Sequence, residues 1–154
     1  MTQHERWMHQ ALRQAQRAFE ENEIPVGAIV VHKEAVIAKG YNQVEMMHDP
    51  TAHAEMIALT AAAAHQGEKF LKDCTLYVTM EPCPMCAGAI VLSRIPTIVF
   101  GCYDPKMGAS GSVMNITENK KLNHRVHVIG GVLDVECGGL MKEFFGKMRK
   151  EKQL

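Results

Sequence analysis

The chain has 154 residues, of which 47% are hydrophobic and 22% are charged, and its formal net charge is zero. These values predict one globular domain over residues 1–154 and leave little room for a second. The charged N-terminal stretch argues against a signal peptide, and no apolar run approaches the roughly 20 residues of a membrane span, so we expect a cytoplasmic protein without membrane contact.

The first half of the chain is expected to contain two helices and a pair of strands. Apolar residues recur at helical spacing from about 5 to 21 and predict an amphipathic helix. Pro25 ends the polar stretch that follows, and residues 26–42 contain two short β-branched runs separated by "HKEA", which predict an antiparallel hairpin. A second helix is expected to start near Thr51, a plausible N-cap, and to stop at Gly67.

The second half is expected to contain three strands and two helices. The expected strands are "CTLYVTM", "TIVFG" and "RVHVIGGV". One helix begins at "PCPMC" and ends before Pro96, residues 103–112 form a loop, and a closing helix runs from about Asp134 to Lys150. The segment of about 133–154 thus holds the C-terminal helix and a basic tail. Helices alternating with strands predict a three-layer α/β/α fold around a central five-stranded mixed sheet.

Cysteine and histidine spacing indicates a metal site. The chain has five cysteines, an odd number that favours metal binding or chemistry over a disulfide framework. Cys83 and Cys86 are three residues apart, so on a helix both can reach one ion from the same side. With His53 they form a set of soft sulfur and nitrogen ligands that selects zinc, one ion per chain. Three protein ligands leave one position open for water, which is typical of catalytic zinc.

Glu55 stands two residues after His53, and residues two apart on a helix point in different directions. The two side chains can act together only if they occupy the first turn, with the helix pointing end-on at the metal. Glu55 is then the proton carrier, because zinc lowers the pKa of bound water to roughly 7 and a nearby carboxylate can move the proton to substrate. The alternatives are a cysteine pair that only packs and a capping histidine beside a surface glutamate.

"HAE" followed by "PCPMC" resembles the H-x-E and P-C-x-x-C signature of the zinc-dependent cytidine and adenosine deaminase superfamily. Residues of about 5 to 149 are similar to the bacterial tRNA-specific adenosine deaminases, which convert the wobble adenosine (position 34) of a tRNA anticodon to inosine. The stretches that carry this resemblance are "EIPVGAIVV", "DPTAHAEMIAL", "TLYVTMEPCPMCAGAIVLSRI", "DPKMGASGS" and "LNHRV". It implies a cytidine deaminase-like fold, attack of zinc-activated water on C6 of adenine, protonation of N1 by Glu55, and loss of ammonia.

The resemblance also implies substrate contacts and an assembly. Asn42 would hydrogen-bond the flipped base, with a turn residue after a strand as the alternative interpretation, and the backbone near Ala54 would help to hold the substrate. The anticodon stem-loop would be held by Asp104, Lys106, Asn123, Phe144, Phe145 and Arg149. Aromatic and cationic side chains suit single-stranded RNA, and one of the two adjacent phenylalanines is expected to face the core. A homodimer is implied, and the apolar helix after "PCPMC" offers a surface for it.

Two other functions fit the same residues. A deaminase of free bases or nucleosides, such as guanine or cytosine, would use the same zinc and glutamate. A zinc-stabilised binding module would hold the metal without turnover. The loop "DPKMGASGS" favours RNA, as do residues 103–154, which carry nine Lys and Arg against six Asp and Glu. A solvated helix face is the alternative explanation of that charge.

Overall fold

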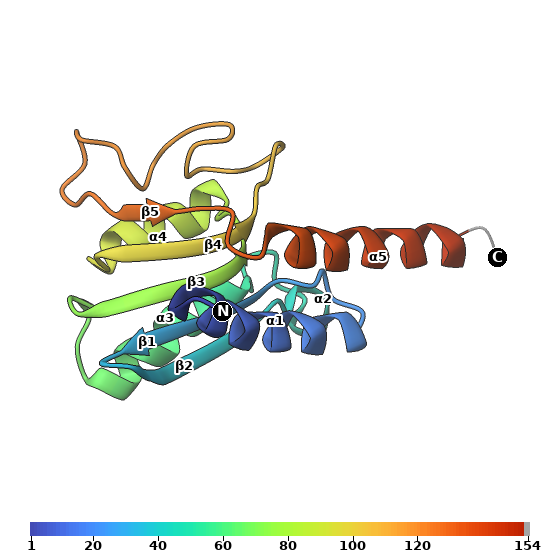
Figure 1. The fold of residues 1–154 in the computed structure, drawn as a ribbon, viewed down its shortest axis with the longest axis horizontal. Coiled ribbons are helices and arrows are strands. Elements are labelled where there is room, and N and C mark those ends of the chain that lie inside the picture. Colours follow the sequence, from blue (N-terminus) through green and yellow to red (C-terminus); the bar gives the residue numbers. More distant parts are fainter. Residues whose placement is uncertain (153–154) are drawn as a thin grey trace.

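A mixed sheet forms the middle layer of the protein (Figure 1). The computed structural model describes residues 1–152, and within them the sheet has five strands in the order β2-β1-β3-β4-β5. The strands are β1 (Gly27–His32), β2 (Ala35–Tyr41), β3 (Cys74–Met80), β4 (Thr97–Cys102) and β5 (His127–Ile129). β1 pairs antiparallel with β2 and β3, whereas β3, β4 and β5 run parallel. The prediction of a mixed α/β sheet with parallel pairing in its second half is confirmed.

Helices cover both faces of this sheet. One face carries α1 (Gln3–Glu20) and α5 (Asp134–Lys152), and the other carries α3 (Ala54–Gln66) and α4 (Pro84–Leu92). Adjacent strand residues point to opposite faces. Leu76 accordingly packs in the core beneath α3 and α4, and Tyr77 packs in the core beneath α1 and α5. None of the helices in the described residues is long and apolar enough to cross a membrane.

Several helix boundaries differ from the sequence-based expectation, those of α3 and α5 among them. Thr51 is not an N-cap, because its hydroxyl and its N–H both donate to the carboxylate of Asp49, and α3 begins three residues later with His53 as its N-cap. α5 extends two residues beyond the expected Lys150, while residues 153 and 154 of the predicted basic tail lie outside the described residues. The four-residue helix α2 (Val44–Met47) was not predicted, because one turn is too short to show a hydrophobic period.

The parallel strands bring the candidate residues to one edge of the sheet. β3 and β4 end at the same edge, so the chain leaves β3 into residues 81–83 and leaves β4 into residues 103–112 side by side. The start of α3 reaches this edge because it lies very close to β2. A Cβ atom on Gly40 would come within 2.5 Å of the carbonyl oxygen of Ala54, so only glycine permits this approach.

Candidate functional site

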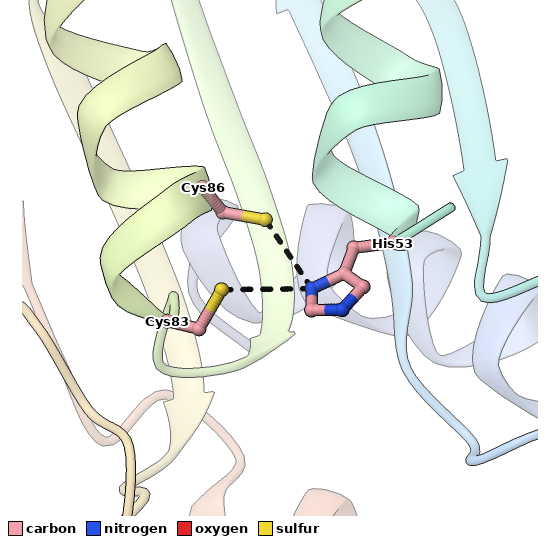
Figure 2. Close-up of side chains that lie close together, drawn as sticks. All are labelled: His53, Cys83 and Cys86. Carbon is pink, nitrogen blue, oxygen red and sulfur yellow. Dashed lines mark hydrogen bonds between the residues drawn. The ribbon is translucent and has the colours of Figure 1, made fainter. Parts of the chain in front are cut away.

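Three side chains from two helix starts converge on one point (Figure 2). His53 is the N-cap of α3, Cys83 is the N-cap of α4, and Cys86 lies in the first turn of α4. The Nδ1 atom of His53 is 3.6 Å from Sγ of Cys83 and 3.5 Å from Sγ of Cys86. One ligand atom from each residue lies within 4.8 Å of the others. The residues therefore form a group that can hold a metal ion.

The spacing of these atoms fits zinc. Zn–S bonds of about 2.3 Å and Zn–N bonds of about 2.0–2.1 Å at the tetrahedral angle place sulfur and nitrogen about 3.6 Å apart. The two measured separations of 3.5 and 3.6 Å agree with that value. One imidazole and two thiols are also a donor set that prefers zinc to magnesium or calcium. Both the distances and the chemistry of the ligands thus suit this ion.

The electrostatics of the group favour thiolate. A hydrogen bond from the thiol of Cys86, helped by His53, lowers the pKa of Cys83 to about 4 against the opposing effect of burial. The same hydrogen bond raises the pKa of Cys86, so the two sulfurs share a proton unequally. The N-termini of α3 and α4 both face the site, and their partial positive charges favour anionic sulfur. The surroundings of the pair therefore favour thiolate, the form of cysteine that binds a metal.

Glu55 lies in the first turn of α3, so this turn holds both members of the "HAE" pair, as the end-on geometry requires. Its side chain is 4% exposed and reaches the thiol of Cys86. Burial raises the pKa of Glu55 to about 7, and the neighbouring His53 acts in the opposite direction. A carboxyl group with a pKa near neutrality can both accept and donate a proton.

Asn42 follows β2 directly, at the same edge of the sheet. The residue is buried, and its backbone N–H donates to the carbonyl of Val26 at 3.0 Å. The short helix α2 comes two residues later, and its first N–H groups are held by a buried carboxylate. Glu23 accepts hydrogen bonds from the N–H groups of Glu45 at 2.9 Å and Met46 at 2.7 Å. Asn42 thus lies in a segment with a fixed backbone.

The loop after β4 carries two of the predicted RNA contacts and borders the metal group. The carboxylate of Asp104 accepts the N–H groups of Lys106 and Met107, which forms a tight turn. The side chain of Lys106 is exposed. The loop is bound to the end of β3 by Glu81, whose carboxylate is 3% exposed and accepts hydrogen bonds from loop residues. Asp104 and Lys106 therefore lie near Cys83.

The two phenylalanines of α5 have different surroundings. Phe144 is 4% exposed and packs edge-on against Phe19 of α1, whereas Phe145 is 41% exposed. One of the pair thus faces the core, as expected. Arg149 lies in the last part of α5, which extends beyond the sheet on the side where α2 lies (Figure 1). Of the three predicted RNA contacts in this helix, Phe145 and Arg149 are exposed and can meet an external partner.

Asn123 is not near the other predicted contacts. Its carbonyl accepts a hydrogen bond from the guanidinium of Arg94 at 2.9 Å, and the imidazole of His124 lies 2.7 Å from the carbonyl of Ile95. Arg94 and Ile95 precede β4, so they lie at the edge of the sheet opposite Cys83. The structure brings His53, Glu55, Cys83, Cys86, Asn42 and Asp104 to one edge and leaves Asn123 at the other.

Sequence reasoning missed Glu23 and Glu81. Each is almost fully buried and holds the backbone of a loop beside the candidate site. Glu23 stands in the polar run "EENE", which is typical of a solvated surface, and Glu81 stands between a strand and a proline. The one available signal was position, because Glu81 separates a buried strand from the Pro–Cys turn. Their hydrogen-bond partners lie too far away along the chain to be identified from the local sequence.

Comparison with known proteins supports a relationship over almost the whole chain. The family model of the MafB19-like deaminases matches residues 2–149. The chain is 46% identical over 153 residues to the tRNA-specific adenosine deaminase of Bacillus subtilis (strain 168), covering 99% of this chain and 95% of that protein. It is 50% identical over 139 residues to the tRNA-specific adenosine deaminase of Aquifex aeolicus (strain VF5), covering 90% and 91%.

A solved structure agrees with these sequence relationships. It comes from biochemical and structural studies of A-to-I editing by tRNA:A34 deaminases at the wobble position of transfer RNA. Its TM-score is 0.83 at 37% identity, and the match covers 86% of this chain and 96% of that chain. The expected three-layer, cytidine deaminase-like fold is confirmed.

Proposed function

The chain belongs to the family of tRNA-specific adenosine deaminases, and from this premise we propose that it converts the wobble adenosine, position 34, of a tRNA anticodon to inosine. The observation that carries the proposal is the group of His53, Cys83 and Cys86 with Glu55 beside it, in a chain that matches these deaminases over almost its full length. The reaction consumes one water and releases ammonia. A tRNA substrate also implies a cytoplasmic enzyme.

We propose that His53, Cys83 and Cys86 hold one zinc ion per chain. Bound there, the ion supplies the Lewis acidity that makes a water molecule nucleophilic at neutral pH. Cys83 offers sulfur that is already easily ionised, and His53 offers its Nδ1 atom at the separations that tetrahedral zinc requires. The two helix N-termini add positive potential behind the ligands.

Glu55 is proposed to move the protons of the reaction. The oxygen of water forms a bond to C6 of adenine, and Glu55 takes a proton from that water and delivers it to N1. The C6 hydroxyl then gives its proton to Glu55, which passes it to the exocyclic amino group. The bond between C6 and that nitrogen breaks as the C6–O bond becomes double, and ammonia leaves. A pKa of about 7 suits this double role, because the carboxyl group can both gain and lose a proton at neutral pH.

The remaining residues are proposed to bind and orient the RNA. Asn42 would hydrogen-bond the extruded base from the fixed segment after β2, and the backbone at Ala54 would hold it over the site. Asp104, Lys106, Phe145 and Arg149 would contact the anticodon loop, since aromatic rings stack on bases and cations neutralise phosphates. The burial of Phe144 fits a supporting position behind Phe145. The RNA contact of Asn123 stays a prediction, at the opposite edge of the sheet.

A homodimer is also proposed. α4 is apolar along its length and ends at Leu92, which is 76% exposed. An exposed apolar side chain on such a helix is suited to a contact with a second copy. Light scattering or sedimentation of the purified protein measures the assembly, and a monomer at micromolar concentration would contradict this part of the proposal.

The deciding experiment uses an anticodon stem-loop with adenosine at the wobble position. We expect inosine at that position and one ammonia released per inosine, and a stem-loop with guanosine there serves as the control. Free guanine, cytosine and their nucleosides are incubated in parallel. Ammonia from these compounds without inosine in the stem-loop would favour the free-base alternative. Elemental analysis of the purified protein is expected to find about one zinc per chain.

A further inference from the structure

We infer that Glu81 is a positioning residue, whose buried carboxylate fixes the loop of residues 104–112 against the metal-binding turn. The inference rests on the proposed function, because it assigns this loop to the RNA substrate. Oε1 of Glu81 accepts the N–H of Asp104 at 3.1 Å, and Oε2 accepts the N–H groups of Ser110 at 3.1 Å and Ser112 at 3.0 Å. The hydroxyl of Ser112 also donates to Oε1. Both carboxylate oxygens are thus committed to one loop.

The backbone of Glu81 and of the next residue also makes hydrogen bonds, directly before the candidate metal ligand Cys83. The N–H of Glu81 donates to the carbonyl of Cys102 at 2.9 Å, which closes the end of β3 against β4. The carbonyl of the next residue, Pro82, accepts the N–H of Ala109 at 2.9 Å. Cys83 follows immediately as a candidate ligand and as the N-cap of α4. The two residues that precede the ligand therefore hold the loop by side chain and by main chain.

Gly108 gives independent evidence for the tightness of this contact. A Cβ atom at this position would lie 2.4 Å from Cδ of Glu81 and 2.5 Å from the carbonyl oxygen of Asp104. The N–H of Gly108 also donates to that same carbonyl at 2.9 Å. The loop is thus wrapped around the Glu81 carboxylate so closely that only glycine fits on its inner side. Any side chain there must push the loop outward.

The loop is the part of the site that the carboxylate controls. It carries Asp104 and Lys106, which are proposed to contact the anticodon. The Glu81 oxygens accept hydrogen bonds from the backbone and the Ser112 hydroxyl of the loop, so they act on substrate only through the loop. Loosening the loop should therefore weaken RNA binding more than it slows the chemical step. This outcome differs from that of a residue that supports the metal ligands, whose loss would remove zinc.

Glu81→Gln tests the inference, because the amide keeps the volume but turns one acceptor into a donor that faces N–H groups. We expect faster amide hydrogen exchange within residues 104–112 and unchanged exchange in the first turns of α3 and α4, with zinc still at about one per chain. With the stem-loop substrate, we expect KM to rise about tenfold and kcat to fall less than about threefold. Asp73→Asn is the matched control, because this exposed carboxylate precedes the same strand at its opposite end.

Gly108→Ala supplies a second test that leaves Glu81 intact. It should produce the same rise in exchange and the same KM effect, and the double variant should show less than the sum of the two, because both act on one contact. Unchanged loop exchange in both single variants, loss of zinc in Glu81→Gln, or a fall in kcat at constant KM would overturn the inference. Hydrogen exchange is measured without RNA, so it tests the role of Glu81 even if the wild-type protein forms no inosine. Failure of inosine formation in the wild type would instead refute the proposed function.

Discussion

Two buried glutamates beside the metal group have opposite surroundings. Glu55 is 4% exposed and Glu81 is 3% exposed. For Glu55, burial is the dominant influence and raises the pKa to about 7. For Glu81, burial acts in the same direction, but hydrogen bonds from Ser112, Asp104 and Ser110 outweigh it and hold the pKa below its ordinary value. Burial with few compensating donors gives a carboxyl group that can move a proton, whereas burial among several donors gives a permanent anion that anchors a loop.

The largest effect is expected from Glu55→Gln, because glutamine has the shape of glutamate but cannot carry the proton. Inosine formation should fall by about 10²- to 10⁴-fold, the range of general acid–base catalysis. Zinc content should stay at that of the wild type, since Glu55 is not a proposed ligand. Single-turnover assays and elemental analysis measure the two quantities. A variant that keeps full activity would place the chemistry elsewhere, and a protein that has no activity to lose would favour a zinc-stabilised binding module.

The loss of stability should be larger for substitution of Glu81 than for substitution of Glu55, which is the reverse of the order expected for activity. Glu81→Gln leaves loop N–H groups without an acceptor, so it should lower the free energy of unfolding by about 1–3 kcal/mol. Glu55→Gln replaces a carboxyl group that burial already disfavours as an anion, so its effect should stay within about 0.5 kcal/mol of zero or be stabilising. Urea denaturation of the proteins stripped of zinc measures both values, because a bound cation beside Glu55 would favour its anion. Equal losses in the two variants would remove the distinction between proton carrier and anchor.

Glu23 extends the comparison to the other side of the site. It is 1% exposed and holds the N–H groups of Glu45 and Met46 in α2, just after Asn42. It should therefore behave as an anchor, and Glu23→Gln should cost about 1–2 kcal/mol of unfolding free energy while zinc is retained. Hydrogen exchange should rise in residues 43–48 and stay unchanged in residues 104–112. Glu20→Gln, an exposed position at the end of α1, is the control. A rise in both loops would indicate general loosening instead.

These anchors also show where sequence reasoning ends. The group of His53, Cys83 and Cys86 could be predicted as a set, because cysteine spacing and the "HAE" pair are local patterns with known chemistry. The hairpin and the parallel half of the sheet followed from hydrophobic runs and from the alternation of strands with helices. The start of α3 was misplaced because Asp49 competes for Thr51, a side-chain contact that propensity does not describe.

The roles of the buried glutamates could not be predicted for a different reason. The partners of Glu23 lie 22 and 23 residues away, and those of Glu81 lie 23 to 31 residues away. Nothing in the neighbouring sequence distinguishes such a residue from a solvated one, since the carboxylate becomes buried only when a distant loop folds over it. The position of Asn123 at the opposite edge has the same origin, because it depends on the path of the long segment between β4 and β5.

The smallest effect is expected from Ser112→Ala, which removes one donor to Glu81 and leaves three backbone donors in place. The hydroxyl should contribute about 0.5–1.5 kcal/mol, the ordinary net value of a hydrogen bond. Exchange should rise only near residues 110–112, and KM for the stem-loop should change less than in Glu81→Gln, because the turn at Asp104 keeps its own contact with Oε1. Thr60→Ala, at an exposed position of α3, is the control for loss of a hydroxyl. A loss as large as that of Glu81→Gln would mean that the Ser112 hydroxyl alone holds the loop, and the three backbone donors would then contribute little to the anchor.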